Sequence, residues 1–170
     1  MEEYTKRKTP RLQNYDYNSV GGYFITICTK NRKCILSRIV GTGVPDCPKI
    51  ELTRYGEIAD KYIRQLDSFY EHISVETYVI MPNHIHILLF VKGGAQSRTP
   101  VPTDENRANS IFSQFISTFK RFCNKEYGEN IWQARANDHI IRGREDYEAV
   151  VKYIYENPKR WHYDELYTEK

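Results

Sequence analysis

Two β-rich segments with only three residues between them constrain the fold of this chain most strongly. Residues 73–80 (ISVETYVI) and 84–91 (HIHILLFV) are rich in β-branched residues, and Met81, Pro82 and Asn83 separate them. Proline and asparagine are frequent in turns, whereas β-branched side chains pack well on a pleated sheet. The pattern therefore predicts an antiparallel hairpin.

Further elements follow from the spacing of apolar residues. Residues 23–29 (YFITICT) alternate and are β-branched, which predicts a strand. Helical spacing predicts one helix after Thr53 as its N-cap, a second over residues 109–128 that stops at Gly128, and a last one over roughly 146–157 that ends before Pro158. Another strand is expected within residues 130–142, and residues 41–49 and 92–108 are expected to be loops.

The order of these elements predicts a single α+β domain. The series strand, helix, strand, strand, helix, strand matches the split β-α-β pattern of the ferredoxin-like (RRM-like) sandwich, an antiparallel sheet with helices on one face. The other face is then free for chemistry or binding, and one C-terminal helix is left over. A chain of 170 residues is long enough for one such core. We predict a basic N-terminal arm, residues 1–20, followed by one domain, residues 21–170.

Composition argues against a membrane protein and is compatible with nucleic-acid binding. The longest apolar stretch falls well short of the roughly 20 residues that span a bilayer, and the first residues do not resemble a signal peptide. The four cysteines show no CxxC spacing, so we expect reduced thiols and a cytoplasmic protein. The chain has 14 tyrosines and 25 lysines and arginines. This mixture suits single-stranded nucleic acid, because tyrosine stacks on bases and cations neutralise phosphates.

His84 and His86 are unusual in a segment that is otherwise apolar. Residues two apart in a strand share a face, so both imidazoles point away from the side of Ile85 and Ile87. At a rise of about 3.3 Å per residue they lie about 7 Å apart along the strand and could converge on one divalent ion. The alternative is that they only form hydrogen bonds on a polar sheet surface. Two ligands are too few for a metal site, so at least one more must come from elsewhere.

The last helix offers candidates for this role. Tyr153 and Asn157 are four residues apart and lie on the same flank of its apolar stripe. Tyr155 lies about 200° round the helix from Tyr153, at 3.6 residues per turn, so only one of the two tyrosines can face the histidines together with Asn157. The alternative is that Asn157 ends the helix and Tyr153 is an ordinary packing residue.

Three motifs together resemble a known family. MPNHIHILL carries the HUH pattern (histidine, hydrophobic, histidine), and WQARANDHIIR and YEAVVKYIYENP follow later in the chain. In these motifs the sequence is similar to the REP-associated tyrosine transposases, which are single-tyrosine HUH transposases of the insertion-sequence type. The likeness runs from about Arg11 to Trp161. One departure is that Ala136 and Asn137 stand where these proteins commonly carry an aromatic pair or an aromatic residue and histidine, which puts DNA affinity or specificity in doubt.

The resemblance implies a metal-assisted DNA transposase. His84, His86 and Asn157 would bind a catalytic Mg²⁺ or Mn²⁺, and Tyr153 would be the nucleophile, on the C-terminal helix. Mn²⁺ would suit imidazole ligands better than Mg²⁺. The partner would be single-stranded or hairpin DNA at REP-like palindromes, cut and rejoined through a 5′-phosphotyrosine by a monomer or homodimer. The alternatives are a non-catalytic nucleic-acid-binding module and a metal-dependent phosphodiester hydrolase.

Basic and aromatic residues elsewhere are candidates for DNA contacts. Those in the arm could equally form a solubilising tail, and those on the second helix could equally be a solvated face. The candidates are Lys6, Arg7, Lys8, Arg11, Tyr15, Tyr17, Lys120, Arg121, Lys125 and Arg142.

Overall fold

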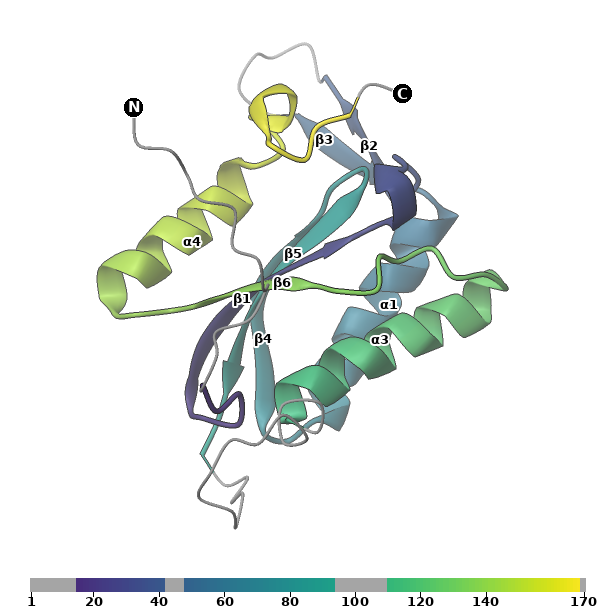
Figure 1. The fold of residues 1–170 in the computed structure, drawn as a ribbon. Helices are drawn as coiled ribbons and strands as arrows, with labels where there is room; N and C mark the ends of the chain where they lie inside the picture. Colours follow the sequence, from purple (N-terminus) through teal and green to yellow (C-terminus); the bar gives the residue numbers. More distant parts are fainter. Residues whose placement is uncertain (1–14, 42–47, 94–109, 169–170) are drawn as a thin grey trace.

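The computed structural model describes residues 15–41, 48–93 and 110–168, which form one sheet with helices on both faces (Figure 1). Single 3₁₀ turns cover Lys30–Arg32 and Trp161–Tyr163. The strands and helices are β1 (Gly21–Cys28), β2 (Ser37–Val40), β3 (Lys49–Leu52), α1 (Arg54–Phe69), β4 (Ile73–Ile80), β5 (His84–Val91), α3 (Ile111–Tyr127), β6 (Asn137–Ile140) and α4 (Arg144–Glu156).

The main sheet has the strand order β4-β5-β1-β6, and all of its pairs are antiparallel. This order and the alternation of elements confirm the predicted ferredoxin-like sandwich. The hairpin of β4 and β5 also forms as predicted. A second, two-stranded sheet of β2 and β3 was not predicted, because each strand has only four residues and gives little alternation to read.

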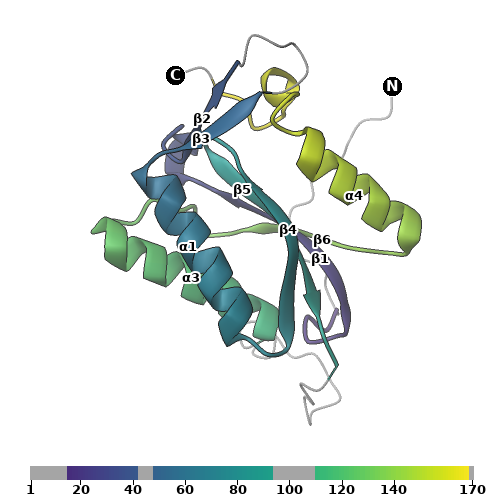
Figure 2. The same cartoon turned by 180° about the vertical axis from the view of Figure 1, so that it is seen from behind.

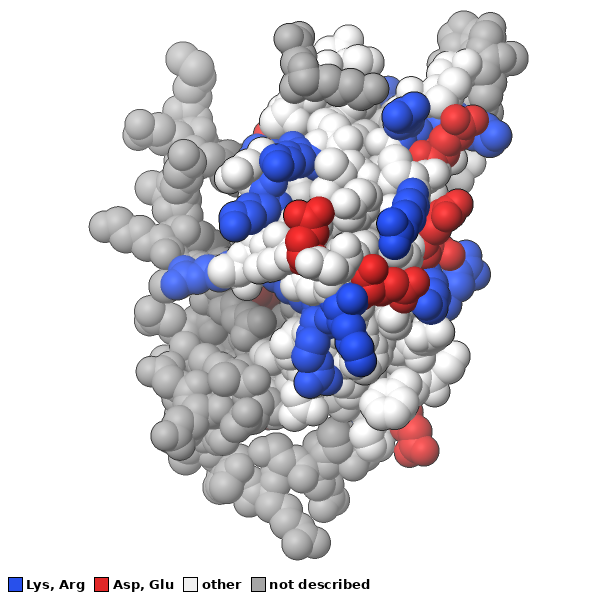
Figure 3. Space-filling model, turned by 90° about the vertical axis from the view of Figure 1, so that its right-hand side faces the viewer, with Lys and Arg blue, Asp and Glu red and all other residues white. Residues whose placement is uncertain are grey.

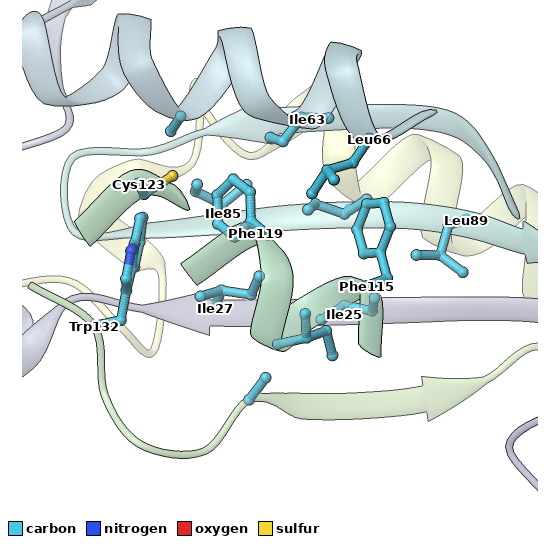
Figure 4. Close-up of a cluster of buried hydrophobic side chains, with 14 of the residues drawn as sticks. Ile25, Ile27, Ile63, Leu66, Ile85, Leu89, Phe115, Phe119, Cys123 and Trp132 are labelled. Carbon is cyan, nitrogen blue, oxygen red and sulfur yellow. The ribbon is translucent and has the colours of Figure 1, made fainter. Parts of the chain in front are cut away.

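Helices α1 and α3 cover one face of the main sheet (Figure 2). As expected, Ile85 and Ile87 point into this layer and are fully buried. Both belong to one core cluster with side chains of α1 and α3. Figure 4 shows Ile85 in this core with Ile63, Phe115 and Phe119. Burying such side chains is worth about 1.5–3 kcal/mol each, so this layer holds the sheet rigid behind the site.

Helix α4 packs on the opposite face, against β4 and β5 (Figure 2). Its predicted apolar stripe is confirmed, since Val150 and Ile154 are buried against Leu88 of β5. The turn at Trp161 closes the same cluster. The face left free of α1 and α3 is therefore partly covered by α4, which brings the end of this helix over the histidines.

The chain entering β1 corrects one prediction about the arm. Tyr17 is only 1% exposed, its ring lies 5.3 Å from that of Phe112, and its hydroxyl donates to Asp138 Oδ2. Tyr15 is half-buried against Tyr17. Tyr17 therefore belongs to the core, because packing and a hydrogen bond hold it there, and in this structure its ring is not exposed for stacking on DNA bases. Lys6, Arg7, Lys8 and Arg11 lie outside the described residues.

The start of α1 gives a test of the fold. Thr53 caps the helix by accepting from the Gly56 amide, as predicted, and a Cβ on Gly56 would lie 2.1 Å from the carbonyl oxygen of Leu36. Because backbone must move to relieve this overlap, Gly56→Ala is expected to lower the free energy of unfolding by about 1–3 kcal/mol in urea denaturation. Gly21→Ala, which meets nothing within 4 Å, is the control and should change it by less than about 0.5 kcal/mol.

Within the described residues, no helix is both long enough and apolar enough to cross a membrane.

Candidate active site

The two histidines meet on the sheet face that α4 covers. His84 and His86 are 0% and 2% exposed, and their Nε2 atoms lie 3.0 Å apart. The rings converge at their tips, as the shared strand face predicted. Two imidazole nitrogens at this separation can bind the same ion.

The opposite nitrogens of both rings are held by neighbouring side chains. His84 Nδ1 lies 2.8 Å from Asn83 Oδ1, and this oxygen can only accept, so Nδ1 carries the proton and the Nε2 lone pair faces the site. His86 Nδ1 lies 2.9 Å from Thr26 Oγ1, on the residue paired with it in β1. Metal-binding histidines typically have their second nitrogen fixed in this way. Asn83 and Thr26 were not predicted as site residues.

Burial keeps both imidazoles neutral. It lowers the pKa of His84 to about 3, with a further contribution from the nearby Arg32 charge. Burial also lowers the pKa of His86 to about 3, and the adjacent His84 acts in the same direction. Both rings are therefore unprotonated near pH 7, which is the form that binds metals.

Helix α4 brings Tyr153 and Asn157 to the histidines, as predicted from their spacing. The Tyr153 ring lies 5.2 Å from the His86 ring and is 42% exposed, whereas Asn157 is 2% exposed. Tyr155 is 78% exposed. Of the two tyrosines it is therefore Tyr153 that faces the histidines.

A carboxylate that was not predicted completes the cluster. Asp164 Oδ2 accepts from Asn157 Nδ2 at 2.6 Å and from the Tyr153 hydroxyl at 3.5 Å, and it lies 3.9 Å from His84 Nε2. One ligand atom each from His84, His86 and Asp164 lie within 4.8 Å of one another. Asp164 follows the 3₁₀ turn at Trp161, outside any periodic segment, so the only signal for it was an acidic residue soon after YIYENP.

One further observation supports Asn157 as a metal ligand. Its amide nitrogen donates to Asp164, while its Oδ1 is buried and has no hydrogen-bond partner among the described residues. An unpaired buried carbonyl oxygen costs roughly 1–3 kcal/mol, and a cation beside it would remove that cost. The residues present thus fit a divalent cation.

The environment of Tyr153 disfavours its ionised form. Burial raises the pKa of Tyr153 to about 12, and the negative charge of Asp164 adds to the shift. The phenol is therefore protonated at neutral pH. A positive charge between the hydroxyl and the carboxylate would act in the opposite direction.

An open cavity of about 480 Å³ borders Tyr153 between the end of α4 and the C-terminal segment. It gives the phenol hydroxyl access to a substrate from solvent. Its lining includes Tyr153, Asn157, Lys159, Arg160, Tyr163 and Asp164.

Comparison with known proteins places the chain among its relatives. A scan against models of protein families gives no match. The chain is 29% identical over 175 residues to an uncharacterised Haemophilus influenzae protein, covering 96% of this chain and 94% of that protein. It is 25% identical over 142 residues to the REP-associated tyrosine transposase of Escherichia coli, covering 84% and 68%.

The chain is similar to the REP-associated tyrosine transposases. Its fold agrees with theirs: a solved REP-associated tyrosine transposase bound to a REP hairpin matches with a TM-score of 0.57 and 23% identity, over 93% of this chain and 73% of that one. The similarity predicted from the HUH and YIYENP motifs is thereby confirmed.

Not all of the basic residues predicted to contact DNA lie on the face of the sheet that carries the histidines. Helix α3 lies on the other face of the sheet, and its Lys120 donates to the carbonyl oxygens of Gln133 and Ala134. Arg121 and Lys125 are exposed. Figure 3 shows the side that carries α1 and α3, where positive and negative side chains are interspersed. Arg142 is exposed just before α4.

Proposed function

We propose that this protein is a DNA transposase that cleaves and rejoins single-stranded DNA at hairpin-forming sequences through a covalent tyrosine intermediate. The observation that carries the proposal is the position of Tyr153, half-exposed at an open cavity and directly beside His86. The name of the E. coli relative and the REP hairpin bound to the solved relative support a transposase with a DNA hairpin as partner.

In the proposed reaction the phenol oxygen of Tyr153 attacks the scissile phosphodiester. The phenol gives up its proton to solvent as a bond forms between its oxygen and phosphorus. The bond from phosphorus to the 3′ oxygen breaks, and this oxygen takes up a proton and leaves as a hydroxyl. The 5′ end then remains attached to the protein as a phosphotyrosine. Because the ester bond is conserved, a 3′ hydroxyl can later attack it and rejoin the strand.

We propose His84, His86 and Asn157 as ligands of a divalent cation, Mg²⁺ or Mn²⁺. The neutral imidazoles and the unpaired Oδ1 of Asn157 support this assignment. When bound there, such an ion supplies a Lewis acid for the phosphate oxygens. Asn83 orients the Nε2 lone pair of His84 toward the ion, and Thr26 holds the His86 ring through its Nδ1.

The deciding experiment is a denaturing gel of the protein with an end-labelled DNA hairpin that carries single-stranded flanks, in the presence of Mn²⁺. The proposal predicts a labelled band that migrates with the protein. Cleaved DNA without such a band would instead indicate a hydrolase in which water attacks. Binding without cleavage would indicate a non-catalytic module.

The proposed arm gives a second prediction, which concerns DNA affinity. Replacing all four arm cations with glutamine should weaken hairpin binding and reduce the slope of log K against log salt by up to about 3.6, since each phosphate contact contributes roughly 0.7–0.9. The four cations are Lys6, Arg7, Lys8 and Arg11.

Fluorescence anisotropy with a labelled hairpin at several salt concentrations measures this effect. The comparison variant is Arg121→Gln with Lys125→Gln on α3, which should change the slope less because α3 lies away from the histidine face. An arm variant with unchanged affinity and slope would refute a DNA-binding role for the arm.

A further inference from the structure

Asp164 is a buried carboxylate beside the paired histidines. Its side chain is 1% exposed, and no lysine or arginine in residues 15–41, 48–93 and 110–168 forms an ion pair with it. Its Oδ2 lies 3.9 Å from His84 Nε2. Burying a carboxylate is costly unless a positive charge lies beside it, and a cation bound at this cluster would supply that charge.

We infer that Asp164 is the anionic ligand of the proposed metal site, so that the complete donor set is His84, His86, Asn157 and Asp164. The inference rests on the proposed function, since it concerns the same ion. Its geometric basis is the convergence of one ligand atom each from His84, His86 and Asp164 within 4.8 Å.

The carboxylate is held in place from both sides. Asp164 Oδ1 accepts from the backbone amide of Leu166 at 2.7 Å, and the carbonyl oxygen of Leu166 accepts from Asn83 Nδ2, also at 2.7 Å. Asn83 is the residue whose Oδ1 orients His84. The Asn83 side chain thus fixes both the His84 imidazole and the C-terminal turn that bears Asp164. A site preorganised in this way does not depend on a rearrangement when an ion binds.

Asp164 also makes the donor set better suited to Mn²⁺ and Mg²⁺. Imidazoles suit Zn²⁺ and its neighbours, whereas Mg²⁺ and Mn²⁺ prefer oxygen ligands, especially carboxylates. Two imidazoles and an amide oxygen form a poor site for a hard cation. Adding Asp164 gives two nitrogen and two oxygen donors with one negative charge, which shifts the preference toward Mn²⁺ and Mg²⁺.

A purely positional role for Asp164 makes a different prediction. Asp164 also accepts from the amide of Asn157, so it could act only by turning Asn157 Oδ1 toward the histidines. Loss of that orientation removes a neutral oxygen donor only, so it should change the ratio of Mn²⁺ to Zn²⁺ affinity less than loss of an anionic ligand. Loss of an anionic oxygen ligand should weaken Mn²⁺ more than Zn²⁺. The ratio of the two affinities therefore separates a ligand from a positioning residue.

The test is a metal titration of the purified full chain, without DNA. Free Mn²⁺ is measured by its electron paramagnetic resonance signal, and Zn²⁺ by competition with a chromophoric chelator. Asp164→Asn is expected to weaken Mn²⁺ binding by at least about 10-fold and Zn²⁺ binding clearly less, as expected for the loss of one ligand. Glu165→Gln is the matched control, because it removes the same charge from the exposed neighbouring residue and should leave both affinities unchanged.

Thermal unfolding in EDTA verifies that the variants are folded, and Asp164→Glu, which keeps the charge, should recover part of the Mn²⁺ affinity. Equal Mn²⁺ affinity in wild type and Asp164→Asn overturns the inference, as does an equal loss for both metals. If His84→Ala still weakens Mn²⁺ binding in that case, the proposed metal site survives. A wild-type protein that binds no Mn²⁺ overturns both.

Discussion

Replacing Tyr153 with phenylalanine is expected to abolish the covalent protein–DNA adduct. The variant keeps the aromatic ring against His86 and Phe24 but lacks the nucleophilic oxygen. Adduct formation should fall by at least about 1000-fold, because no other group replaces the attacking atom. Hairpin affinity and the free energy of unfolding should change little, since the hydroxyl lies at a half-exposed position and its hydrogen bond to Asp164 is long, at 3.5 Å.

Tyr155→Phe is the matched control for this variant. Tyr155 lies on the same helix, two residues away, and is 78% exposed. It should form the adduct at the wild-type rate, measured as labelled DNA retained on the protein in a denaturing gel. An adduct that persists in Tyr153→Phe and disappears in Tyr155→Phe would reverse the assignment.

Removal of the His86 imidazole has the second largest expected effect. His86 is buried between His84, Thr26 and Tyr153, and His86→Ala removes one proposed metal ligand and one wall of the site. Adduct formation in Mn²⁺ should fall by at least about 100-fold, since stabilisation of charge on the phosphate is lost. Treatment of the wild type with EDTA should have the same effect, and added Mn²⁺ should reverse it.

The control is His139→Ala. His139 is half-exposed on β6, two strands from β5 in the sheet, and pairs with Asp146 at 2.9 Å. It should leave the metal-dependent reaction unchanged. A His86→Ala variant with the full Mn²⁺-dependent rate would show that the paired imidazoles have no part in the reaction.

Much of the fold could be predicted because it depends on local pattern. The alternation in β1 and β5, the Thr53 cap of α1 and the left-handed Gly128 that ends α3 are all readable within a few residues. The pairing of His84 with His86 followed from the two-residue period of a strand. The choice between Tyr153 and Tyr155 was left open by helical geometry and is decided by the packing of α4.

The remaining features depend on contacts between distant parts of the chain. Tyr17 is buried through a hydrogen bond to Asp138, 121 residues later. Asp164 reaches the histidines only because the turn after α4 folds back and Asn83 anchors Leu166. Neither contact can be predicted from a periodic pattern of residues in the sequence. Pattern therefore identified His84, His86, Tyr153 and Asn157, and missed the site residues that depend on contacts between distant segments, Thr26, Asn83 and Asp164.

Peptide mapping by mass spectrometry tests the central claim most directly. The protein is incubated with a DNA hairpin and Mn²⁺, the DNA is trimmed with a nuclease, and the protein is digested. The account predicts that the peptide containing Tyr153 carries the mass of a 5′-linked nucleotide on that tyrosine. Cleaved DNA with an unmodified Tyr153, or a nucleotide attached to another residue, would contradict it.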